Sequence, residues 1–325
     1  MQRKGIRGWW RSTAGNKPTD VPSGAKLDRD LAIGRMEVGG VPMADSRRIS
    51  SAPIIAAYTD SPADMTKFEG QLNRPVDVAV AFTDSDTIQS NDFPFWLQWP
   101  GTRKLILSQC LIANGWDMAT TATGAHDSDY AEAADKIAEW QDRILSVRIG
   151  WEFNVTGGYP WTVGGPGASN QTAARYQACF HRFATMIRDR APGVLIDWCP
   201  LADHVLPDPW YPGDDVVDII GNDVYTKEEF HSGSFDDVLD WDAGLIWQEK
   251  FAQAHGKLMG FAEWATDYDG GIAEDFIKKM AAWMQRPRVN RVVYHGYWNS
   301  NQVVSTKLDD KPLNLAAYKA AFAEL

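Results

Sequence analysis

The sequence predicts a single α/β domain, a (β/α)8 or TIM barrel, preceded by an irregular N-terminal extension. Its 325 residues are 44% hydrophobic and 23% charged, which is ordinary globular composition and sufficient length for one large barrel. Eight short runs of β-type residues follow residue 50, and amphipathic helical stretches lie between several of them. The alternative is an open, doubly wound sheet, but no glycine-rich dinucleotide-binding loop follows the first run. These observations favour the closed barrel.

The elements are predicted in chain order. Residues 1–50 are rich in Gly, Arg, Lys, Asp, Ser and Pro and lack periodicity, so we interpret them as an extension and place the barrel at 51–325. The predicted strands are Ile54–Tyr58, Val76–Phe82, Lys104–Gln109, Leu145–Phe153, Val194–Pro200, Val216–Tyr225, Lys257–Trp264 and Arg291–Asn299. Predicted helices include Tyr130–Arg143, Thr172–Arg190, Phe235–His255, Ile272–Gln285 and Leu313–Leu325. Eight strands followed by helices match the usual size of a closed barrel.

Charge and composition narrow the class of partner. The formal net charge of -11 disfavours binding to nucleic acid and to anionic lipid. No apolar stretch is long enough to insert into a membrane, and the basic start of the chain lacks the apolar segment of a secretory signal. The 15 tryptophans are unusual, because large flat rings are costly to expose unless they meet a ligand. Sugar rings, with apolar faces bordered by hydroxyls, have the matching shape.

Metal and cofactor chemistry finds no support in the sequence. Cys110, Cys179 and Cys199 lack the spacing of a zinc site, and we interpret them as buried small side chains. The six histidines are scattered, and no phosphate-binding loop or nucleophile elbow occurs. The segment from Asp267 resembles the start of a calcium loop, but Ile272 and Lys278 stand where that loop needs Gly and Glu. We therefore expect neither a metal nor a cofactor.

Two glutamates stand at the ends of predicted strands, where barrel enzymes carry their active sites. Glu152 closes an apolar run on the fourth strand, and Glu263 does so on the seventh. Cleavage of a glycosidic bond needs one protonated and one ionised carboxyl group, so the pair fits that chemistry. Alternatively, each glutamate ends its strand in a salt bridge or a helix cap. Arg148, inside the fourth strand, is expected to be a buried charge partner of Glu263 or of a nearby aspartate.

Residues 51–325 resemble glycoside hydrolase family 26, whose members are retaining (β/α)8 enzymes acting mainly on β-mannans, and some on β-1,3-xylan or mixed-linkage β-glucan. The resemblance rests on three segments: Val-Arg-Ile-Gly-Trp-Glu-Phe-Asn at 147–154, Tyr-Pro-Trp at 159–161, and Trp-Tyr-Pro-Gly-Asp-Asp-Val-Val-Asp-Ile-Ile-Gly-Asn-Asp-Val-Tyr at 210–225. The third is the most specific. One position departs from the family: Trp151 replaces the usual histidine before the acid/base glutamate, and an indole cannot accept a hydrogen bond as an imidazole can.

The resemblance implies roles for individual residues. Glu152 would be the general acid/base and Glu263 the nucleophile, to which Tyr225 would donate a hydrogen bond. Trp298 would form the floor of the subsite that holds the reactive sugar. Asn154, which shares a face with Glu152 if the strand is extended, is a candidate for binding a sugar hydroxyl or else a turn former. The remaining candidates for substrate binding are Trp151, Trp161 and Trp210, although loop aromatics also cover small cores.

The sequence therefore predicts a retaining, endo-acting hydrolase of a β-linked polysaccharide or oligosaccharide, working as a monomer. The substrate class favours an extracellular location. The rival hypothesis is a noncatalytic carbohydrate-binding barrel, such as an adhesin or a virion-associated protein, that keeps the aromatic cleft and has lost turnover through the change at Trp151. The presence of both glutamates favours the enzyme.

Overall fold

The computed structural model describes residues 52–83, 88, 96, 99, 103–162, 172–227, 234–288, 290–302 and 304–322. The predicted extension, residues 1–50, lies outside this part of the chain, so the boundary at residue 50 stays a prediction. Within the described part, each helix is too short or too polar to cross a bilayer.

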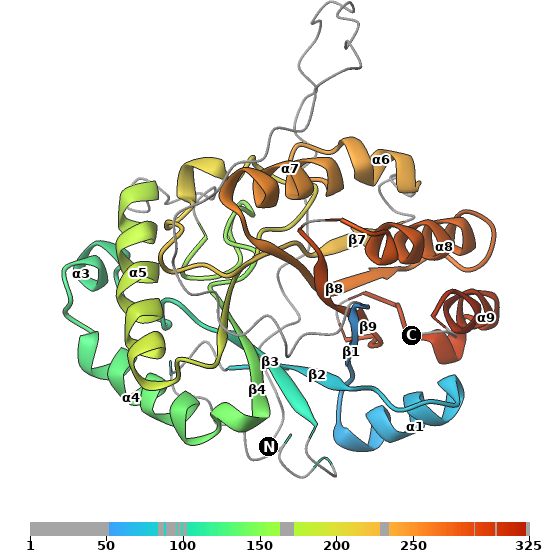
Figure 1. Ribbon diagram of the computed structural model, residues 1–325, viewed down its shortest axis with the longest axis horizontal. Helices are drawn as coiled ribbons and strands as arrows, with labels where there is room; N and C mark the ends of the chain where they lie inside the picture. Colours follow the sequence, from blue (N-terminus) through green and yellow to red (C-terminus); the bar gives the residue numbers. More distant parts are fainter. Residues whose placement is uncertain are drawn as a thin grey trace, which may run out of the picture. The chain divides into compact units, whose positions relative to one another are not determined.

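A closed parallel barrel forms the centre of the described chain (Figure 1). Its strands run in the order β6-β5-β4-β3-β2-β1-β9-β8, and the pairing of β6 with β8 closes the ring. β7 pairs with the C-terminal end of β8 and so continues the position in the barrel that β6 occupies. The strands are β1 (Ile54–Tyr58), β2 (Val78–Phe82), β3 (Lys104–Gln109), β4 (Ile144–Ile149), β5 (Leu195–Trp198), β6 (Ile219–Gly221), β7 (Val224–Thr226), β8 (Leu258–Thr266) and β9 (Val292–Trp298). The predicted barrel is confirmed.

The sixth predicted strand is wrong in one respect, because it is two short strands separated by Asn222 and Asp223. The Asn222 amide still donates to Gly260 O on β8 at 3.1 Å. The Asp223 amide instead donates to Pro200 O, and Asp223 O accepts from the Ala202 amide, each at 3.0 Å. Asp223 therefore leaves the ladder to β8 and fastens the segment that follows β5.

Helices surround the barrel (Figure 1). They are α1 (Pro62–Leu72), α3 (Met118–Ala122), α4 (Asp127–Glu139), α5 (Ala173–Arg190), α6 (Phe235–Asp240), α7 (Leu245–His255), α8 (Ile272–Gln285) and α9 (Pro312–Ala321), with short 3-10 turns η2 (Gln141–Arg143), η4 (Asp208–Trp210) and η6 (Leu308–Asp310). The single helix predicted over 235–255 is interrupted between α6 and α7. A side chain at Gly244 would collide with the backbone of Val238 and Trp241, so the turn requires glycine there.

The core lies on both faces of the strands, as expected for a parallel sheet covered by helices. Val80, Leu107 and Val147 are completely buried. Cys110, Cys179 and Cys199 are free and buried, which confirms their interpretation as small core side chains. The barrel interior also holds polar groups: Tyr294 on β9 donates to Asp197 on β5, whose pKa is raised by burial to about 6.

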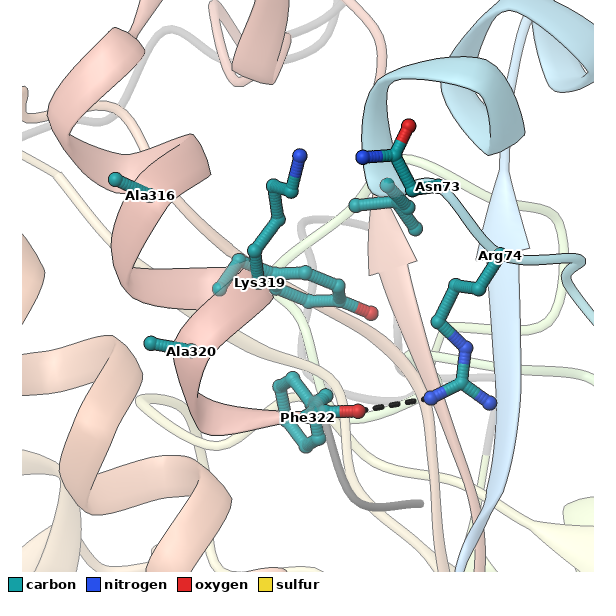
Figure 2. A pocket seen from close by; sticks show the side chains of 8 residues that line it. Asn73, Arg74, Ala316, Lys319, Ala320 and Phe322 are labelled. Carbon is teal, nitrogen blue, oxygen red and sulfur yellow. Dashed lines mark hydrogen bonds between the residues drawn. The ribbon is translucent and has the colours of Figure 1, made fainter.

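One cavity lies where the chain passes from α1 toward β2, and so at the N-terminal ends of the strands. It measures about 600 Å³ and is bounded by the end of α1 and by α9 (Figure 2). The Arg74 Nη1 donates to Phe322 O at 2.8 Å across it, and Lys319 also lines it. Among the residues that the structure describes, no carboxylate lines this cavity. It is therefore remote from the strand ends at which catalytic groups of a barrel gather.

Candidate active site

The acid at Glu152 is presented by a tight turn, not by the end of a strand as predicted. β4 stops at Ile149, and Gly150 follows with φ of 54°. Glu152 itself has φ of 51°, a left-handed conformation that few non-glycine residues adopt. Its backbone N–H donates to Cys199 O at 2.8 Å, which anchors the turn to the end of β5. Strained backbone of this kind is concentrated at functional sites.

The second carboxyl group, on Glu263, lies in the middle of β8 and accepts hydrogen bonds on both oxygens. Arg148 Nη2 donates to Oε1, and the Tyr225 hydroxyl donates to Oε2 at 2.6 Å. The Glu263 backbone N–H donates to Asp223 Oδ1 at 3.1 Å, which fixes the strand beneath the side chain. The hydrogen bond implied for Tyr225 is therefore present. Two donors, one of them a cation, stabilise a negative charge on Glu263.

Arg148 is the buried cation that the sequence predicts for this region. Its side chain is fully buried, and it bonds Glu263 through one terminal nitrogen and Asp223 through the other. Its Nε and Nη2 also donate to Ser108 Oγ at 3.1 and 2.8 Å. Burial opposes the guanidinium charge, but the two carboxylates outweigh it and raise the pKa of Arg148. The buried guanidinium thus orients the Glu263 carboxylate.

Glu152 has an environment that favours the protonated form. The residue is only 4% exposed, and the hydroxyl of Tyr159 donates to its Oε2 at 3.3 Å. Burial, followed by the negative charge of Glu263, raises the pKa of Glu152 from 4.5 to about 7, although Arg148, His204 and Lys227 oppose the rise. Burial and the neighbouring charge thus favour the neutral form of Glu152, while Arg148 and Tyr225 donate hydrogen bonds to Glu263, and this difference suits an acid and a nucleophile.

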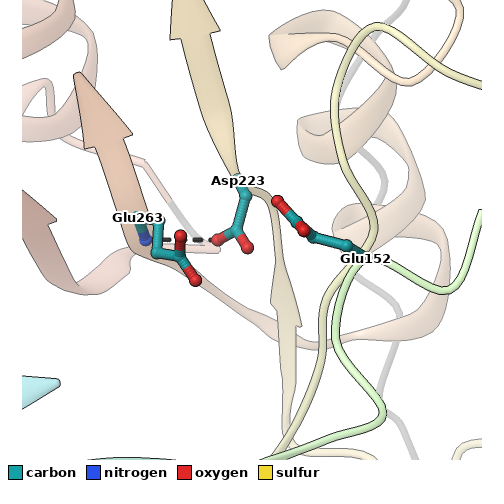
Figure 3. A group of neighbouring side chains, drawn as sticks. All are labelled: Glu152, Asp223 and Glu263. Carbon is teal, nitrogen blue, oxygen red and sulfur yellow. Dashed lines mark hydrogen bonds between the residues drawn. The ribbon is translucent and has the colours of Figure 1, made fainter. Parts of the chain in front are cut away.

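The two glutamates and Asp223 converge on one point (Figure 3). One oxygen from each of the three lies within 4.8 Å of the others. Three such carboxylates could ligate a divalent cation, but Arg148 already binds Asp223 and Glu263 and neutralises part of their charge. The geometry brings Glu152 and Glu263 close enough to act on opposite sides of one bond.

An aromatic wall borders these carboxyl groups. Trp298, at the end of β9, stacks on Tyr58 with ring centroids 3.8 Å apart and an interplanar angle of 11°. Phe82 at the end of β2 contacts both Trp298 and Trp151 edge-on, at 5.7 and 5.2 Å. The buried Nε1 of Trp298 has no hydrogen-bond partner in the described part of the chain. A buried donor of this kind is costly unless a ligand or water accepts from it.

Three of the predicted substrate-binding residues, Asn154, Trp161 and Trp210, are held by contacts within the protein. The strand-face argument for Asn154 is wrong because residues 150–153 form a turn, and its amide bonds the backbone of Leu201 and Val205 instead. Trp161 is completely buried and donates to Trp151 O at 2.8 Å, so it supports Trp151 instead of presenting a free face. Trp210, on η4, contacts Phe153 in a segment that α5 holds through Gln177.

Two residues that affect Glu152, one through a hydrogen bond and one through its charge, are absent from the predicted set. Tyr159 could have been found from its place in the Tyr-Pro-Trp segment, seven residues after Glu152. His204 comes from the segment after β5 and hydrogen-bonds Asp203 Oδ1 at 2.6 Å. Its only signal in the sequence is an Asp-His pair that follows a strand end. Such a pair is too common on protein surfaces to indicate a site by itself.

Comparisons with known proteins agree with the geometry. Residues 118–261 match the family model described as glycosyl hydrolase family 26, a range that includes Glu152 and Tyr225 and ends two residues before Glu263. No curated protein matches the chain by sequence.

Several solved structures share the fold. An endo-beta-1,4-mannanase double mutant from Cellulomonas fimi superposes with a TM-score of 0.58 at 18% identity, covering 84% of this chain and 71% of that one. The catalytic domain of a family 26 endo-beta-1,4-mannanase from a Bacillus species gives 0.58 at 17% identity, with 86% and 87% covered. A family 26 protein from a Muricauda species gives 0.60 at 14% identity, with 84% and 86% covered.

Proposed function

The chain belongs to glycosyl hydrolase family 26 and is a glycoside hydrolase; from this premise we propose that it is a retaining, endo-acting enzyme that cleaves a β-linked polysaccharide by double displacement. Glu152 is the acid/base and Glu263 the nucleophile in this proposal. The observation that carries it is the pair of carboxyl oxygens within 4.8 Å of each other. Retaining enzymes hold their carboxyl groups about 5 to 5.5 Å apart, whereas inverting enzymes leave room for a water at about 6.5 Å or more.

In the first step, Glu263 attacks the anomeric carbon and the neutral Glu152 donates its proton to the leaving oxygen. Arg148 and Tyr225 orient the attacking carboxylate and limit the directions from which it can approach. A glycosyl ester to Glu263 and an ionised Glu152 result. In the second step Glu152 takes a proton from water, which attacks the same carbon and restores Glu263 as a carboxylate.

The aromatic wall supports a sugar substrate. Trp298, which stacks on Tyr58, offers an apolar ring face beside the carboxyl groups. Its N–H, which has no partner among the described residues, is available to a hydroxyl group. The choice of polysaccharide is a finer proposal. Two of the solved structures that share the fold are described as endo-beta-1,4-mannanases, so β-mannan is the first substrate to test. Trp151, in place of a histidine, makes xylan and mixed-linkage β-glucan the necessary comparisons.

The stereochemical course tests the mechanism directly. Proton NMR of the anomeric signals during early hydrolysis should show that the first product keeps the β configuration. An α product would exclude double displacement. Release of internal fragments, measured as a rapid fall in viscosity relative to reducing ends, should accompany it, and a slow fall in viscosity would exclude endo action.

Azide rescue tests the separate roles. On an activated aryl glycoside, Glu152→Ala should lose the base of the second step and regain rate with added azide, which needs no base. Glu263→Ala should lose essentially all turnover. Equal rates for wild type and Glu152→Ala would refute the assignment of the acid/base. Glu139→Ala, which changes an exposed glutamate in α4, serves as the control.

A further inference from the structure

The hydroxyl group of Tyr159 contacts the proposed acid/base and has no step in the mechanism above. It donates a hydrogen bond to Glu152 Oε2, and the two oxygens are 3.3 Å apart. Among the described residues, no group donates to the other carboxyl oxygen, Oε1. The two oxygens of Glu152 are therefore not equivalent, because one has a partner in the protein and the other is available to a reacting group.

Two tryptophans hold the ring of Tyr159. The ring lies parallel to that of Trp161, with centroids 4.8 Å apart and an interplanar angle of 1°, and Trp151 contacts it at 5.2 Å with an angle of 60°. Trp161 is completely buried, so this contact cannot shift without disturbing the core. Aromatic contacts of this kind stabilise one arrangement of the rings. The hydroxyl group is consequently presented at a fixed position.

Backbone contacts fix the loop that carries both residues. Trp161 Nε1 donates to Trp151 O at 2.8 Å and so joins the positions on either side of Glu152 and Tyr159. The amide and the hydroxyl of Thr162 both donate to Tyr159 O, at 3.2 and 2.9 Å. The separation between the tyrosine hydroxyl and the carboxyl group is therefore set by hydrogen bonds within the loop itself.

We propose that Tyr159 is a positioning residue that holds Glu152 by Oε2 and leaves Oε1 as the oxygen that exchanges the proton. This inference rests on the proposed role of Glu152. A protonated carboxyl group donates through one oxygen and accepts through the other, so a donor at Oε2 favours the hydrogen on Oε1. In the first step the Oε1–H bond breaks, and the leaving oxygen takes the proton and keeps the electron pair of the glycosidic bond. In the second step Oε1 takes a proton from the attacking water.

The length of the hydrogen bond suits a group that acts during the reaction. The usual O–H···O distance is about 2.7 to 2.8 Å, so a bond of 3.3 Å is weak. Catalytic hydrogen bonds are often long before substrate binds and tighten in the complex. Hydrogen bonds to an ionised carboxylate are also shorter and stronger than those to a neutral one. Tyr159 should therefore favour the ionised form of Glu152, which the proposed second step requires.

The other groups whose charges act on Glu152 are Glu263 on β8, Asp223 between β6 and β7, Arg148 on β4, His204 after β5 and Lys227 after β7. Burial, followed by the charges of Glu152 and Glu263, raises the pKa of Tyr159 well above its ordinary value of 10. The tyrosine therefore keeps its hydrogen where Glu152 titrates. Tyr159→Phe retains the ring and all of these charged groups, so the variant isolates the hydrogen bond.

Two aryl glycosides test the proposal, one with phenol and one with dinitrophenol as the leaving group. In Tyr159→Phe, kcat/KM should fall about 3- to 10-fold on the phenyl glycoside, the effect of one lost hydrogen bond. On the dinitrophenyl glycoside, whose leaving group needs little acid help, it should fall by less than about twofold. The alkaline limb of kcat/KM reports the pKa of Glu152 in the free enzyme and should move to higher pH by about half a unit to one unit.

A double variant tests whether Tyr159 acts through Glu152. Adding Tyr159→Phe to Glu152→Ala should not change the azide-rescued rate, because the partner of the hydroxyl group is already gone. The control is Tyr211→Phe, which removes a tyrosine hydroxyl that donates to Asp214 Oδ1 at 2.9 Å. This control should leave the alkaline limb and the ratio of the two kcat/KM values unchanged.

Three results would overturn the inference: equal losses on both aryl glycosides, an alkaline limb that stays in place, or the same loss from Tyr159→Phe with and without Glu152. Its failure is distinguishable from failure of the proposed function. An impaired Glu152→Ala together with a Tyr159→Phe that behaves as wild type refutes only the role of Tyr159. Full activity in Glu152→Ala refutes the acid/base itself.

Discussion

Removing the charge of Glu263 should lower the pKa of Glu152. The difference between the ordinary value of 4.5 and about 7 corresponds to about 3 kcal/mol in favour of the protonated carboxyl. Burial is the largest cause and the charge of Glu263 the second. Two unit charges about 5 Å apart interact by roughly 1 to 3 kcal/mol at effective dielectric constants between 80 and 20. Glu263→Gln should therefore lower the pKa of Glu152 by about one unit, to roughly 6.

The measurement is a carbon-13 NMR titration of the glutamate side-chain carboxyl groups, with the Glu152 signal assigned by its loss in Glu152→Gln. Glu263→Gln also leaves the charge of Arg148 less neutralised, which acts in the same direction. Glu139→Gln provides the control, because Glu139 is exposed and bonded to Lys136 on α4. A Glu152 pKa that stays near 7 or rises in Glu263→Gln would show that the two carboxyl groups do not interact, and the reasoning would fail.

Three further outcomes are expected. Because the pKa of Glu152 is raised on folding, the folded state binds more protons than the unfolded state between pH 4.5 and about 7, so stability falls as pH rises through that window. In chemical denaturation, the free energy of unfolding of Glu152→Gln should equal that of wild type at pH 4 and exceed it by up to about 3 kcal/mol at pH 8. A difference that does not change with pH would contradict this. Tyr225→Phe removes a hydrogen bond to the charged Glu263 that is worth about 1.5 to 3 kcal/mol, so kcat/KM should fall about 10- to 100-fold. An unchanged kcat/KM would show that this hydrogen bond does not contribute to catalysis. Gly150→Ala should lower the free energy of unfolding by roughly 1 to 3 kcal/mol, because the φ of Gly150 is 54° and an added Cβ would meet neighbouring side chains. Gly193→Ala is the neutral control, because Gly193 has open space around it. Equal losses in the two variants would refute the account.

The barrel could be predicted because it depends on periodicity, which the sequence displays directly. Strands β1, β3 and β9 lie within a residue of their predicted bounds, since apolar runs between polar segments identify buried parallel strands. The division of the sixth strand at Asn222 could not be predicted, because it results from hydrogen bonds to β8 and to the segment after β5. Those partners are distant in the chain, and no local pattern reports them.

The site was predictable in its residue types and less so in its geometry. Arg148 was expected to pair with Glu263 or an aspartate, and it pairs with both kinds, because a cation inside a strand of a barrel must find buried anions. Asn154 was misplaced because alternation of faces holds only in extended backbone, and the left-handed Glu152 ends that extension. Neither propensity nor spacing signals a glutamate with positive φ.

The buried guanidinium has a consequence for the whole proposed reaction cycle. Before the proposed first step, Glu263, paired with Arg148, carries the one negative charge of the two glutamates, because Glu152 is protonated. After glycosyl transfer, the ester on Glu263 is neutral and Glu152 is ionised, so the total is again one negative charge. The charge has moved across less than 5 Å from one carboxyl group to the other. No counterion needs to enter or leave, so the cycle can run with sugar filling the mouth of the barrel.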